Sequence, residues 1–594
     1  IKSRTEVDDV EEGEPSIIKC PYHVAQRMER ALLMHYEYHE GKRKYFLESV
    51  VCNYDDCEVN RVSGWLLKWL KLTREAVYSD PPDILITNED MINVILMQNP
   101  AEHTIIGNSV KVCHNCGTTY ANLRKKACDV CGSNNLVLLS GLTYPEVIVL
   151  DEAHLLRGSF GIQTYYLLRR LEHAIRVTHG LPDSWAPVYI VSSATISKPE
   201  LFTSSLIGCS TNAVRHIEAK YEEEEGTGYK VEARRYFVFL MPKAYTVQAT
   251  TIRALRRFYE YSLMRGHCPQ TIVFVNRLAE SNELVRSLVD EMEHYLGVRV
   301  GGHTTDYDYD RVTIEQRFTV KKIHALVATR TLEVGVDYGA VDGVTVYGMP
   351  YYISDFTQRI GRAGRNRDAV VFVVFNPDIP IDYYYYQNYE LLHSPPLRSS
   401  AMELESYTVK VDNHEAFTRS LKRAVFDYLA VESHAFSLGV AYDGADPARL
   451  HDLLERALYV DNNLSPTLIH YVKHACALPE GTPAPADVRE IVEECVKQIF
   501  DVVQYCGRIE DIIENLKEVF RLWDLRRADS EVVIVFPDSL IDRRRNRRPR
   551  GLSYAVRHYM RGQITSYRGY FFVVTTIEGG RMSLRGWAGP SKRL

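Results

Sequence analysis

The sequence predicts an α/β protein with two successive α/β units, a helical region and a small β unit. The first observation is a set of short apolar runs bounded by polar residues, typical of buried parallel strands, at 147–150, 188–191, 271–275, 325–328 and 344–347. The second is apolar spacing of three and four residues, which predicts helices over 453–460 and 487–522. The third is the alternation from Tyr567 to Thr576, which predicts strands.

These patterns divide the 594 residues into consecutive parts. In chain order we expect an N-terminal accessory or incomplete segment (1–70), a first α/β domain (71–220) with an insertion (about 108–135), an acidic linker (221–233), a second α/β domain (234–380), a helical domain (381–530), and a basic loop with a small β domain (531–594). Helical spacing also predicts helices over 25–38 and 65–77, and an apolar run predicts a strand over 81–88.

The composition is that of an ordinary globular protein, with 45% hydrophobic and 25% charged residues. The net charge of −6 argues against general polyanion binding, so any nucleic-acid surface has to be a local patch. No uncharged apolar run reaches the roughly 18 residues expected of a membrane span, and no signal peptide is visible. The chain begins with Ile1 rather than methionine, from which we expect further residues upstream.

Two adjacent carboxylates follow the first predicted strand, in the segment Val147-Ile-Val-Leu-Asp-Glu-Ala-His154. Because open α/β sheets bind ligands at the carboxyl ends of their strands, we expect Asp151 and Glu152 at a ligand site. Asp151 could hold a Mg²⁺ ion that bridges nucleotide phosphates, and Glu152 could orient and deprotonate the attacking water. The alternative is a buried strand that ends in a charged turn.

Small hydroxyl side chains follow the next predicted strand, at Ser193 and Thr195. They could hydrogen-bond to the acidic segment and relay the state of a bound nucleotide to a second site. The alternative is that these hydroxyls only cap the helix that follows.

The second α/β unit closes with Gln358-Arg-Ile-Gly-Arg-Ala-Gly-Arg365. Arg362 and Arg365 are three residues apart, so on a helix they would share a face. If that face meets the acids of the first unit, both arginines could clamp the γ-phosphate of a nucleotide. Upstream, Gly335 and Asp337 lie in a stretch where glycine and small polar groups let the backbone approach phosphates. The alternative for the arginines is a solvated, arginine-rich helix.

Several uncharged or basic side chains could contact a nucleic-acid backbone, because phosphates accept hydrogen bonds from such groups. The candidates are Thr87 and Asn88 after the predicted strand 81–88, Thr329 and Thr331 after the strand 325–328, and Arg543, Arg544 and Arg545 in the basic run 543–550. Capping is the alternative for Thr87 and Asn88, and a solvated charge run is the alternative for the arginines. The tyrosines at 383–386 could stack on bases or simply pack.

Four of the twelve cysteines form two Cys-x-x-Cys-Gly knuckles, Cys113 with Cys116 and Cys128 with Cys131. Four thiolates make a closed tetrahedral site, so the spacing predicts a structural Zn²⁺ ion in a reducing compartment. An iron–sulfur cluster is the alternative. A second metal site at Cys20, His23, Cys52 and Cys57 has irregular spacing, and ordinary thiols are the alternative there.

The ordered set Asp151-Glu-Ala-His154, Ser192-Ser-Ala-Thr195 and Gln358 to Arg365 resembles the motifs of superfamily-two DEAH-type helicases. The resemblance implies two tandem RecA-like domains that bind ATP and Mg²⁺ between them, with His154 and Gln358 in the catalytic set. The segments DEAHLLRGSFG, LRRL, TLEVGVD and NPDIPID resemble the MrfA/YprA branch. That branch implies a cytoplasmic, bacterial or archaeal, ATP-driven translocase that acts on DNA.

Some proteins of that branch pair the motor with a cysteine-rich C-terminal domain, but no four-cysteine cluster follows residue 400 here. A split arrangement resembles the anti-phage DISARM system, in which the helicase DrmA works with a separate partner, DrmB. The resemblance therefore implies a separate protein partner similar to DrmB, and a role in anti-phage defence or DNA repair.

The chief departure is that no GxxxxGK[ST] phosphate loop occurs anywhere in the sequence. Either that loop lies in residues outside this sequence, or the protein does not hydrolyse ATP. Two other hypotheses follow: a helicase-like DNA-binding scaffold for a partner, and an RNA helicase, because these motifs contact backbone and not bases.

Overall fold

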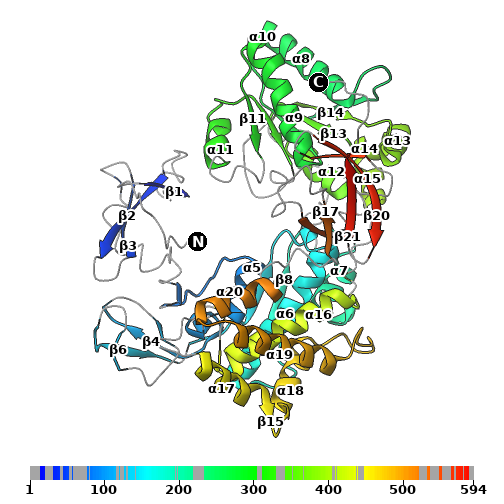
Figure 1. The fold of residues 1–594 in the computed structure, drawn as a ribbon. Coiled ribbons are helices and arrows are strands. Elements are labelled where there is room, and N and C mark those ends of the chain that lie inside the picture. Colours follow the sequence, from blue (N-terminus) through cyan, green and yellow to red (C-terminus); the bar gives the residue numbers. More distant parts are fainter. Residues whose placement is uncertain are drawn as a thin grey trace.

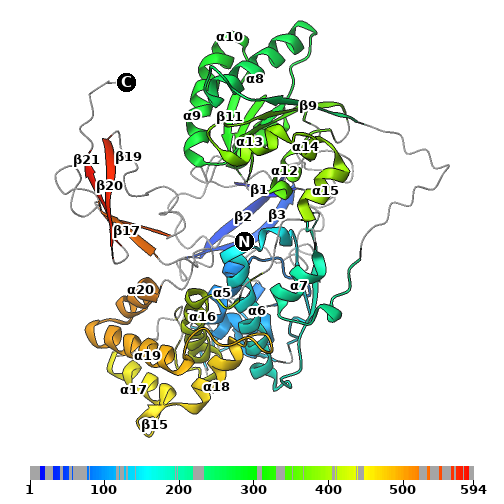
Figure 2. The ribbon, with the colours of Figure 1, turned by 90° about the vertical axis from the view of Figure 1, so that its right-hand side faces the viewer.

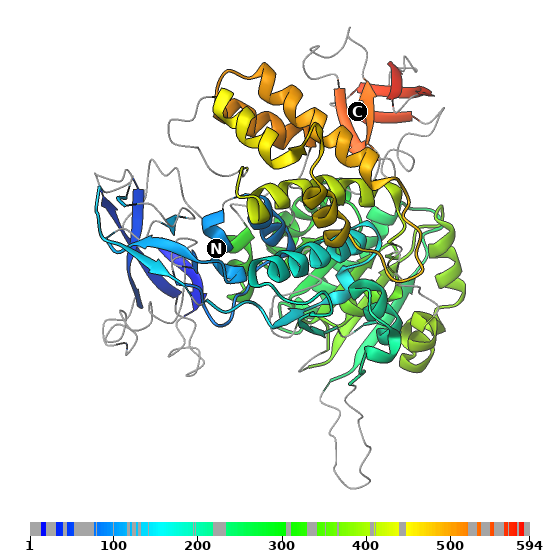
Figure 3. The same ribbon diagram turned by 90° about the horizontal axis from the view of Figure 1, so that it is seen from below.

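The structure is a computed structural model of the chain (Figures 1 to 3). It describes residues 14–19, 31–39, 44–52, 57, 77–78, 80–98, 100–115, 119–120, 126–128, 132–140, 142–193, 195–196, 198–217, 233–303, 311–329, 341–350, 352–364, 367–403, 409, 411–436, 438, 447–520, 531–535, 547–551, 564–567, 570–578 and 581–586. In the first three and the last five of these ranges, the backbone alone is described. Below, residues 77–217 are called the first half, 233–403 the second half, and 411–520 the helical region.

The second half is built on a six-stranded sheet in the order β11-β12-β10-β13-β14-β9, in which all five neighbouring pairs are parallel. Every residue of β10 and β12 is buried, which confirms the prediction of buried strands there. A parallel sheet covered on both faces requires such continuous apolar runs. Its strands are β9 (Arg235–Leu240), β10 (Thr271–Val275), β11 (Val300–His303), β12 (Ala325–Ala328), β13 (Gly343–Tyr347) and β14 (Ala369–Val374).

Helices cover both faces of this sheet (Figure 1). Side chains alternate along each strand, so Val273 and Val327 pack with α8 and α9, whereas Ile272 and Leu326 pack with α11 and α12. The helices of the second half are α8 (Val247–Met264), α9 (Leu278–Leu288), α10 (His294–Leu296), α11 (Arg311–Thr319), α12 (Ile353–Ile360), α13 (Pro380–Gln387), α14 (Glu390–His393) and α15 (Pro395–Glu403).

In the first half, β7 (Val147–Leu150) pairs in parallel with β8 (Val188–Val191), as predicted. The prediction that these strands are buried is wrong for one face. Val149 is 59% exposed and Ile190 is 50% exposed, while Ile148 on the other face packs into the core. Helices α5 (Glu89–Met97), α6 (Gly158–His179) and α7 (Pro199–Ile207) accompany the pair. Within the described residues, α6 and its neighbours cover one face of this sheet, which is why only alternate side chains are buried.

The strand predicted over 81–88 is wrong: the structure has no strand in this stretch. Pro81 and Pro82 lack the backbone N–H that a strand donates. At the other end, the Asn88 side chain accepts a hydrogen bond from Met91 N at 2.9 Å and caps α5. Capping, the alternative considered for this asparagine, is therefore what the structure shows.

The helix predicted over 25–38 is also wrong where the backbone is described. Residues 31–39 form strand β2 (Ala31–His39), between β1 (Glu14–Lys19) and β3 (Lys44–Cys52), in an antiparallel sheet. Strand pairing overrides the helical spacing here, since apolar and aromatic residues suit either structure. The helix predicted over 65–77 lies outside the described residues except for Val77, which is helical.

Residues 411–520 are mainly helical, as predicted. The elements are α16 (His414–Asp427), α17 (Pro447–Leu458), the short strands β15 (Tyr459–Val460) and β16 (Asn463–Leu464), α18 (Pro466–Ala475), α19 (Val488–Tyr505) and α20 (Ile509–Phe520). Five further strands form one sheet: β17 (Glu531–Val535), β18 (Arg547–Gly551), β19 (Ile564–Tyr567), β20 (Tyr570–Glu578) and β21 (Arg581–Gly586). Every helix in the described part of the chain is too short or too polar to span a lipid bilayer.

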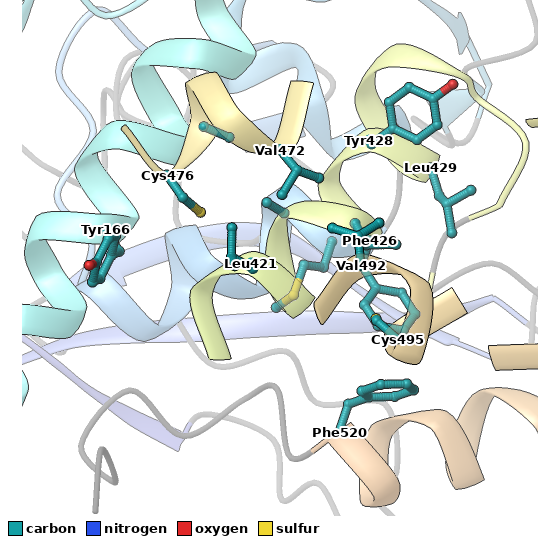
Figure 4. Packing of buried hydrophobic residues seen from close by; sticks show 14 of the residues in the cluster. Tyr166, Leu421, Phe426, Tyr428, Leu429, Val472, Cys476, Val492, Cys495 and Phe520 are labelled. Carbon is teal, nitrogen blue, oxygen red and sulfur yellow. The ribbon is translucent and has the colours of Figure 1, made fainter. Parts of the chain in front are cut away.

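The helical region and the first half share one hydrophobic core (Figure 4). Tyr166 of α6 lies in the same buried cluster as Leu421 of α16, Val472 of α18 and Cys495 of α19. Phe426 and Phe520 stack edge to face within it, with ring centroids 5.3 Å apart. The long buried face of α6 therefore joins the first half to the helices that follow the second half in sequence.

A buried ion pair reinforces the same junction. Arg170 of α6 donates through Nε and Nη2 to the two carboxylate oxygens of Asp427 in α16, at 2.6 and 2.8 Å. Its Nη1 donates to Asn93 of α5 at 2.6 Å. Arg170 is 1% exposed and Asp427 is fully buried, so each charge depends on the other for compensation.

Acid should weaken this junction through His173, a buried residue of α6 that packs edge to face on Tyr471 of α18. Burial, with a smaller contribution from His474, lowers the pKa of His173 from 6.5 to about 4. Because the folded-state pKa is depressed, the unfolded chain binds the proton first, so stability is lost as pH falls from 6.5 towards 4. Between pH 7 and 5 we expect the wild type to lose about 2 kcal/mol more than His173→Phe in denaturant unfolding. Equal losses in the two proteins would contradict this.

Candidate nucleotide site

Asp151 and Glu152 stand directly after β7, at the carboxyl end of the parallel pair. Ser192, which follows β8, donates a hydrogen bond through Oγ to Asp151 Oδ1 at 2.6 Å. Glu152 has a positive φ of 49°, a backbone conformation that residues other than glycine adopt rarely and that is often found at functional sites. The Asp151 side chain is exposed and the Glu152 side chain is partly buried, so both carboxylates remain open to a ligand.

His154 lies in the short helix after these acids, is fully buried and joins three segments. Its Nδ1 lies 3.1 Å from Ser193 Oγ and 3.2 Å from Glu152 Oε2. Its Nε2 lies 2.6 Å from Gln358 Nε2 in α12, and the same amide nitrogen donates to Thr195 Oγ1 at 3.2 Å. The predicted set of Ser193, Thr195, His154 and Gln358 is therefore brought together across the two halves.

Burial, with the nearby Arg157, lowers the pKa of His154, which favours the neutral imidazole. With Gln358 Nε2 as donor, the imidazole accepts through Nε2 and carries its proton on Nδ1, where Ser193 and Glu152 can accept it. The other amide atom, Gln358 Oε1, is buried and has no hydrogen-bond partner among the described residues. A donor from a bound water or ligand between the halves could complete it.

Glu152 and Arg362 influence each other across the same boundary. Burial and the neighbouring Asp151 raise the pKa of Glu152, and the positive charge of Arg362 opposes that rise. The arginine segment of the second half thus lies near the acids of the first half. A raised pKa suits a carboxylate that has to accept a proton.

The expected helical placement is wrong for Arg362. Helix α12 ends at Ile360, and Gly361 caps it, so Arg362 lies in the turn that follows. Gly364, with a φ of 67°, keeps the chain from continuing as a helix. Arg365 lies outside the described residues.

Only some of the candidate contacts to phosphates and nucleic acid lie within the described residues. Thr87 and Asn88 are exposed before α5, and Thr329 lies partly buried at the end of β12. The following candidates lie outside the described residues: Thr331, Gly335, Asp337, Arg543, Arg544 and Arg545. Among the tyrosines of α13, Tyr385 packs against the core, whereas Tyr383 and Tyr384 are half exposed.

The four-cysteine insertion forms a three-stranded antiparallel sheet, β5-β4-β6, with β4 (Val110–Cys113), β5 (Thr119–Tyr120) and β6 (Leu136–Leu139). Cys113 and Cys128, one from each knuckle, are buried in one small cluster with Tyr120. The Tyr120 hydroxyl donates to Cys128 Sγ at 3.1 Å. Cys116 and Cys131 lie outside the described residues, as do Cys20 and His23, while Cys57 is buried.

Two arginines near this site escaped the sequence argument, one at the boundary and one inside the second half. Arg157, three residues after His154, contacts Tyr352, Ser354 and Asp355 in the second half. Arg359 of α12 donates to Asn276 Oδ1 at 2.9 Å and is buried. Neither residue stands in a spacing that distinguishes it from a solvated arginine, so the tertiary contact alone identifies them.

Comparison with known proteins agrees with this geometry. Residues 251–367 match the family described as "Helicase conserved C-terminal domain". The chain is 28% identical over 340 residues to an uncharacterized ATP-dependent helicase of Methanocaldococcus jannaschii, covering 57% of this chain and 41% of that protein. It is 26% identical over 272 residues to the ATP-dependent helicase YprA of Bacillus subtilis, covering 45% and 34%. It is 20% identical over 422 residues to the DISARM protein DrmA of Bacillus paralicheniformis, covering 65% and 37%.

Among solved structures, the helicase MrfA bound to DNA and AMPPNP aligns with 87% of this chain and 58% of its own, at 20% identity and a TM-score of 0.43. These matches make the chain similar to ATP-dependent helicases, among them YprA, and its residues 251–367 similar to the C-terminal domain of helicases. It spans less than half the length of the curated relatives that it matches.

Proposed function

We propose that the chain is the motor part of an ATP-dependent DNA helicase or translocase, which hydrolyses ATP between the two α/β halves. One observation carries this proposal: Glu152 and His154 of the first half meet Gln358 and Arg362 of the second half. A nucleotide held between these groups couples phosphate chemistry to the relative position of the halves. The likeness to YprA supports the same activity.

The residues present fit a nucleotide with Mg²⁺. The exposed Asp151 carboxylate, oriented by Ser192, is a hard oxygen ligand of the kind that Mg²⁺ prefers. When bound, the ion would neutralise charge that develops on the phosphates. Glu152 would accept the proton of the attacking water, and Arg362 and Arg365 would stabilise the transferring phosphoryl group. Gly335 and Asp337 are proposed to lie along the phosphates.

The rival is a helicase-like scaffold that binds DNA for a partner without hydrolysing ATP. It is favoured by one observation, the lack of a GxxxxGK[ST] loop in this sequence. The loop's lysine and hydroxyl normally grip the phosphates and the metal ion. Since the chain spans 41% of its M. jannaschii relative, the test needs the full-length protein.

We expect Glu152→Gln to reduce the DNA-stimulated rate of ATP hydrolysis by roughly 10² to 10⁴-fold, because the amide cannot accept the proton of the attacking water. Release of phosphate by the full-length protein measures this rate. The matched control is Glu146→Gln, an exposed carboxylate just before β7, which should leave the rate unchanged. An unchanged rate in Glu152→Gln would remove that residue from its role, and a wild type without any hydrolysis would favour the scaffold.

For the nucleic acid, we propose DNA as the substrate, single-stranded or duplex with a single-stranded end, contacted by Thr87, Asn88, Thr329 and Thr331. The basic run with Arg543, Arg544 and Arg545, beside a small β domain at 531–594, would add phosphate contacts. An RNA helicase remains the alternative, because all these contacts are to the backbone. Unwinding of duplexes in which DNA and RNA strands are exchanged distinguishes the two.

We further propose that Cys113, Cys116, Cys128 and Cys131 hold one structural Zn²⁺ that stiffens the β5-β4-β6 insertion. The burial of Cys113 and Cys128 in one cluster supports this, since the two knuckles need to face the same ion. We expect Cys113→Ser and Cys128→Ser each to lower the zinc content measured by elemental analysis, while Cys209→Ser, an exposed cysteine elsewhere, should not. Iron in place of zinc would overturn the assignment.

The biological setting is proposed from the likeness to DrmA, which covers 65% of this chain. We propose a role in anti-phage defence, with DNA repair as the alternative, and a separate partner protein similar to DrmB. Loss of phage protection on deletion of the gene would support defence. Sensitivity to DNA damage without loss of protection would support repair.

A further inference from the structure

We propose that Arg157 is a positioning residue that locks the arginine-bearing segment of the second half against the acid-bearing segment of the first. The inference rests on the proposed function for its role in hydrolysis. The contact by which Arg157 holds the two halves together does not depend on whether ATP is hydrolysed.

The Arg157 side chain reaches across the boundary to the first turn of α12. Its Nη1 donates to Ser354 Oγ at 3.3 Å, and its Nη2 donates to the carboxylate of Asp355. The guanidinium carbon lies 3.8 Å from the centre of the Tyr352 ring, a cation–π distance. One arginine thus holds a ring, a hydroxyl and a carboxylate. This use of a planar guanidinium fork is one that lysine cannot reproduce.

The contact is shielded from water, which distinguishes it from an ordinary surface ion pair. The Arg157 side chain is 11% exposed, and the Asp355 side chain is 1% exposed. Exposed pairs contribute little because water and salt screen them, whereas loss of one partner of a buried pair leaves a charge uncompensated. Asp355 also stands in the first turn of α12, where the helix dipole favours a negative charge.

The spacing of the contacts makes the clamp specific for the site. Arg157 contacts Asp355, and His154 contacts Gln358, so the partners are three residues apart on both segments. Residues three apart on α12 lie on one face, and two contacts along that face restrict both sliding and rotation of the helix. Helix α12 leads directly into Arg362, on the side of the second half that faces the first (Figures 1 and 2).

The electrostatics of the site agree with this arrangement. Arg157 lowers the pKa of His154, and Asp355 raises it, after the larger effect of burial. Both partners of the clamp are therefore close enough to act on the histidine that joins the acids to Gln358. A shift of α12 would disturb the clamp and the histidine contact together.

The experiment compares Arg157→Ala with Arg176→Ala in the full-length protein. Arg176 lies in the last turn of α6, the helix that begins directly after Arg157, is similarly covered, and pairs with Glu172 one turn earlier. Spin labels introduced as unnatural amino acids at Met264 and Tyr505, which are 84% and 85% exposed, report the distance between the second half and the helical region. Measurements use a non-hydrolysable ATP analogue with single-stranded DNA. The turnover number of DNA-stimulated ATP hydrolysis is measured in parallel.

We expect Arg157→Ala to broaden or lengthen the distance distribution and to lower the turnover number by about 10²-fold, as misplacement by an ångström can do. Arg176→Ala should change neither. Addition of Asp355→Asn to Arg157→Ala should cost no further activity, since the two residues act through one contact. Arg157→Lys, which keeps the charge in case the alanine variant does not fold, should show the same change in distance with a smaller loss of turnover.

An unchanged distance distribution in Arg157→Ala and Arg157→Lys would overturn the clamp, as would an equal change in Arg176→Ala. The distance measurement needs no hydrolysis. A wild type that does not turn over ATP would therefore contradict the proposed function, while the clamp would still be tested by its geometry.

Discussion

Replacement of Arg362 by alanine is expected to lower the DNA-stimulated turnover number for ATP by about 10³-fold, the effect of removing an arginine that stabilises a transferring phosphoryl group. Arg362 lies near enough to Glu152 to oppose the rise of its pKa, so its charge reaches the acids of the first half. Because the guanidinium compensates charge that develops during transfer, the Michaelis constant for ATP should change much less than the turnover number.

The matched control is Arg367→Ala, five residues further along the same segment. Arg367 pairs with Asp342 inside the second half, with Nε 3.0 Å from Oδ1. Its loss should leave the turnover number within about threefold of the wild type, because a partly exposed ion pair contributes little. Comparable losses in the two variants would show that the segment acts through folding and not through the charge of Arg362.

Replacement of Asp427 by alanine should cost about 3–5 kcal/mol of unfolding free energy, because it leaves the buried Arg170 guanidinium without its carboxylate. Arg170 donates two of its hydrogen bonds to Asp427 and is 1% exposed, so water cannot take the place of the lost partner. Denaturant unfolding followed by circular dichroism measures the change. We expect the transition that contains α6 and α16 to move, since this pair joins those two helices.

Asp511→Ala provides the comparison for that measurement. Asp511 of α20 pairs with Arg508, the residue before that helix, at 3.2 Å, but their side chains are 45% and 73% exposed. An exposed pair of this kind contributes little to stability, because water and salt screen its charges. If Asp427→Ala costs no more than Asp511→Ala, the buried pair does not hold the junction together.

The second half could be predicted well from the sequence, because buried parallel strands have a strong signature. Runs such as Thr271–Val275 and Ala325–Ala328 are apolar at every position, and the structure buries them completely. The same signature misled at Val147–Leu150 and Val188–Val191, where the apolar run is as long but one face is open in the described residues. Composition reports what a strand can bury and not what is present to cover it.

The sequence was enough to predict which residues form the site, but not how all of them are placed. Asp151, Glu152, His154 and Gln358 were chosen from motifs, and the structure brings them together. The helical placement of Arg362 failed because helix periodicity says nothing about where Gly361 and Gly364 end the helix. Arg157 was missed because its partners, Ser354 and Asp355, are nearly 200 positions away along the chain and no local pattern connects them.

The shared core of α6 with α16 and α18 has a mechanical consequence. Residues that follow the second half in sequence return to pack on the first, so the polypeptide crosses the seam between the halves twice. The helical region and the first half therefore form one packed unit, and the chain runs between this unit and the second half at two places. Any movement of the first half relative to the second would carry the helical region with the half that bears Asp151 and Glu152.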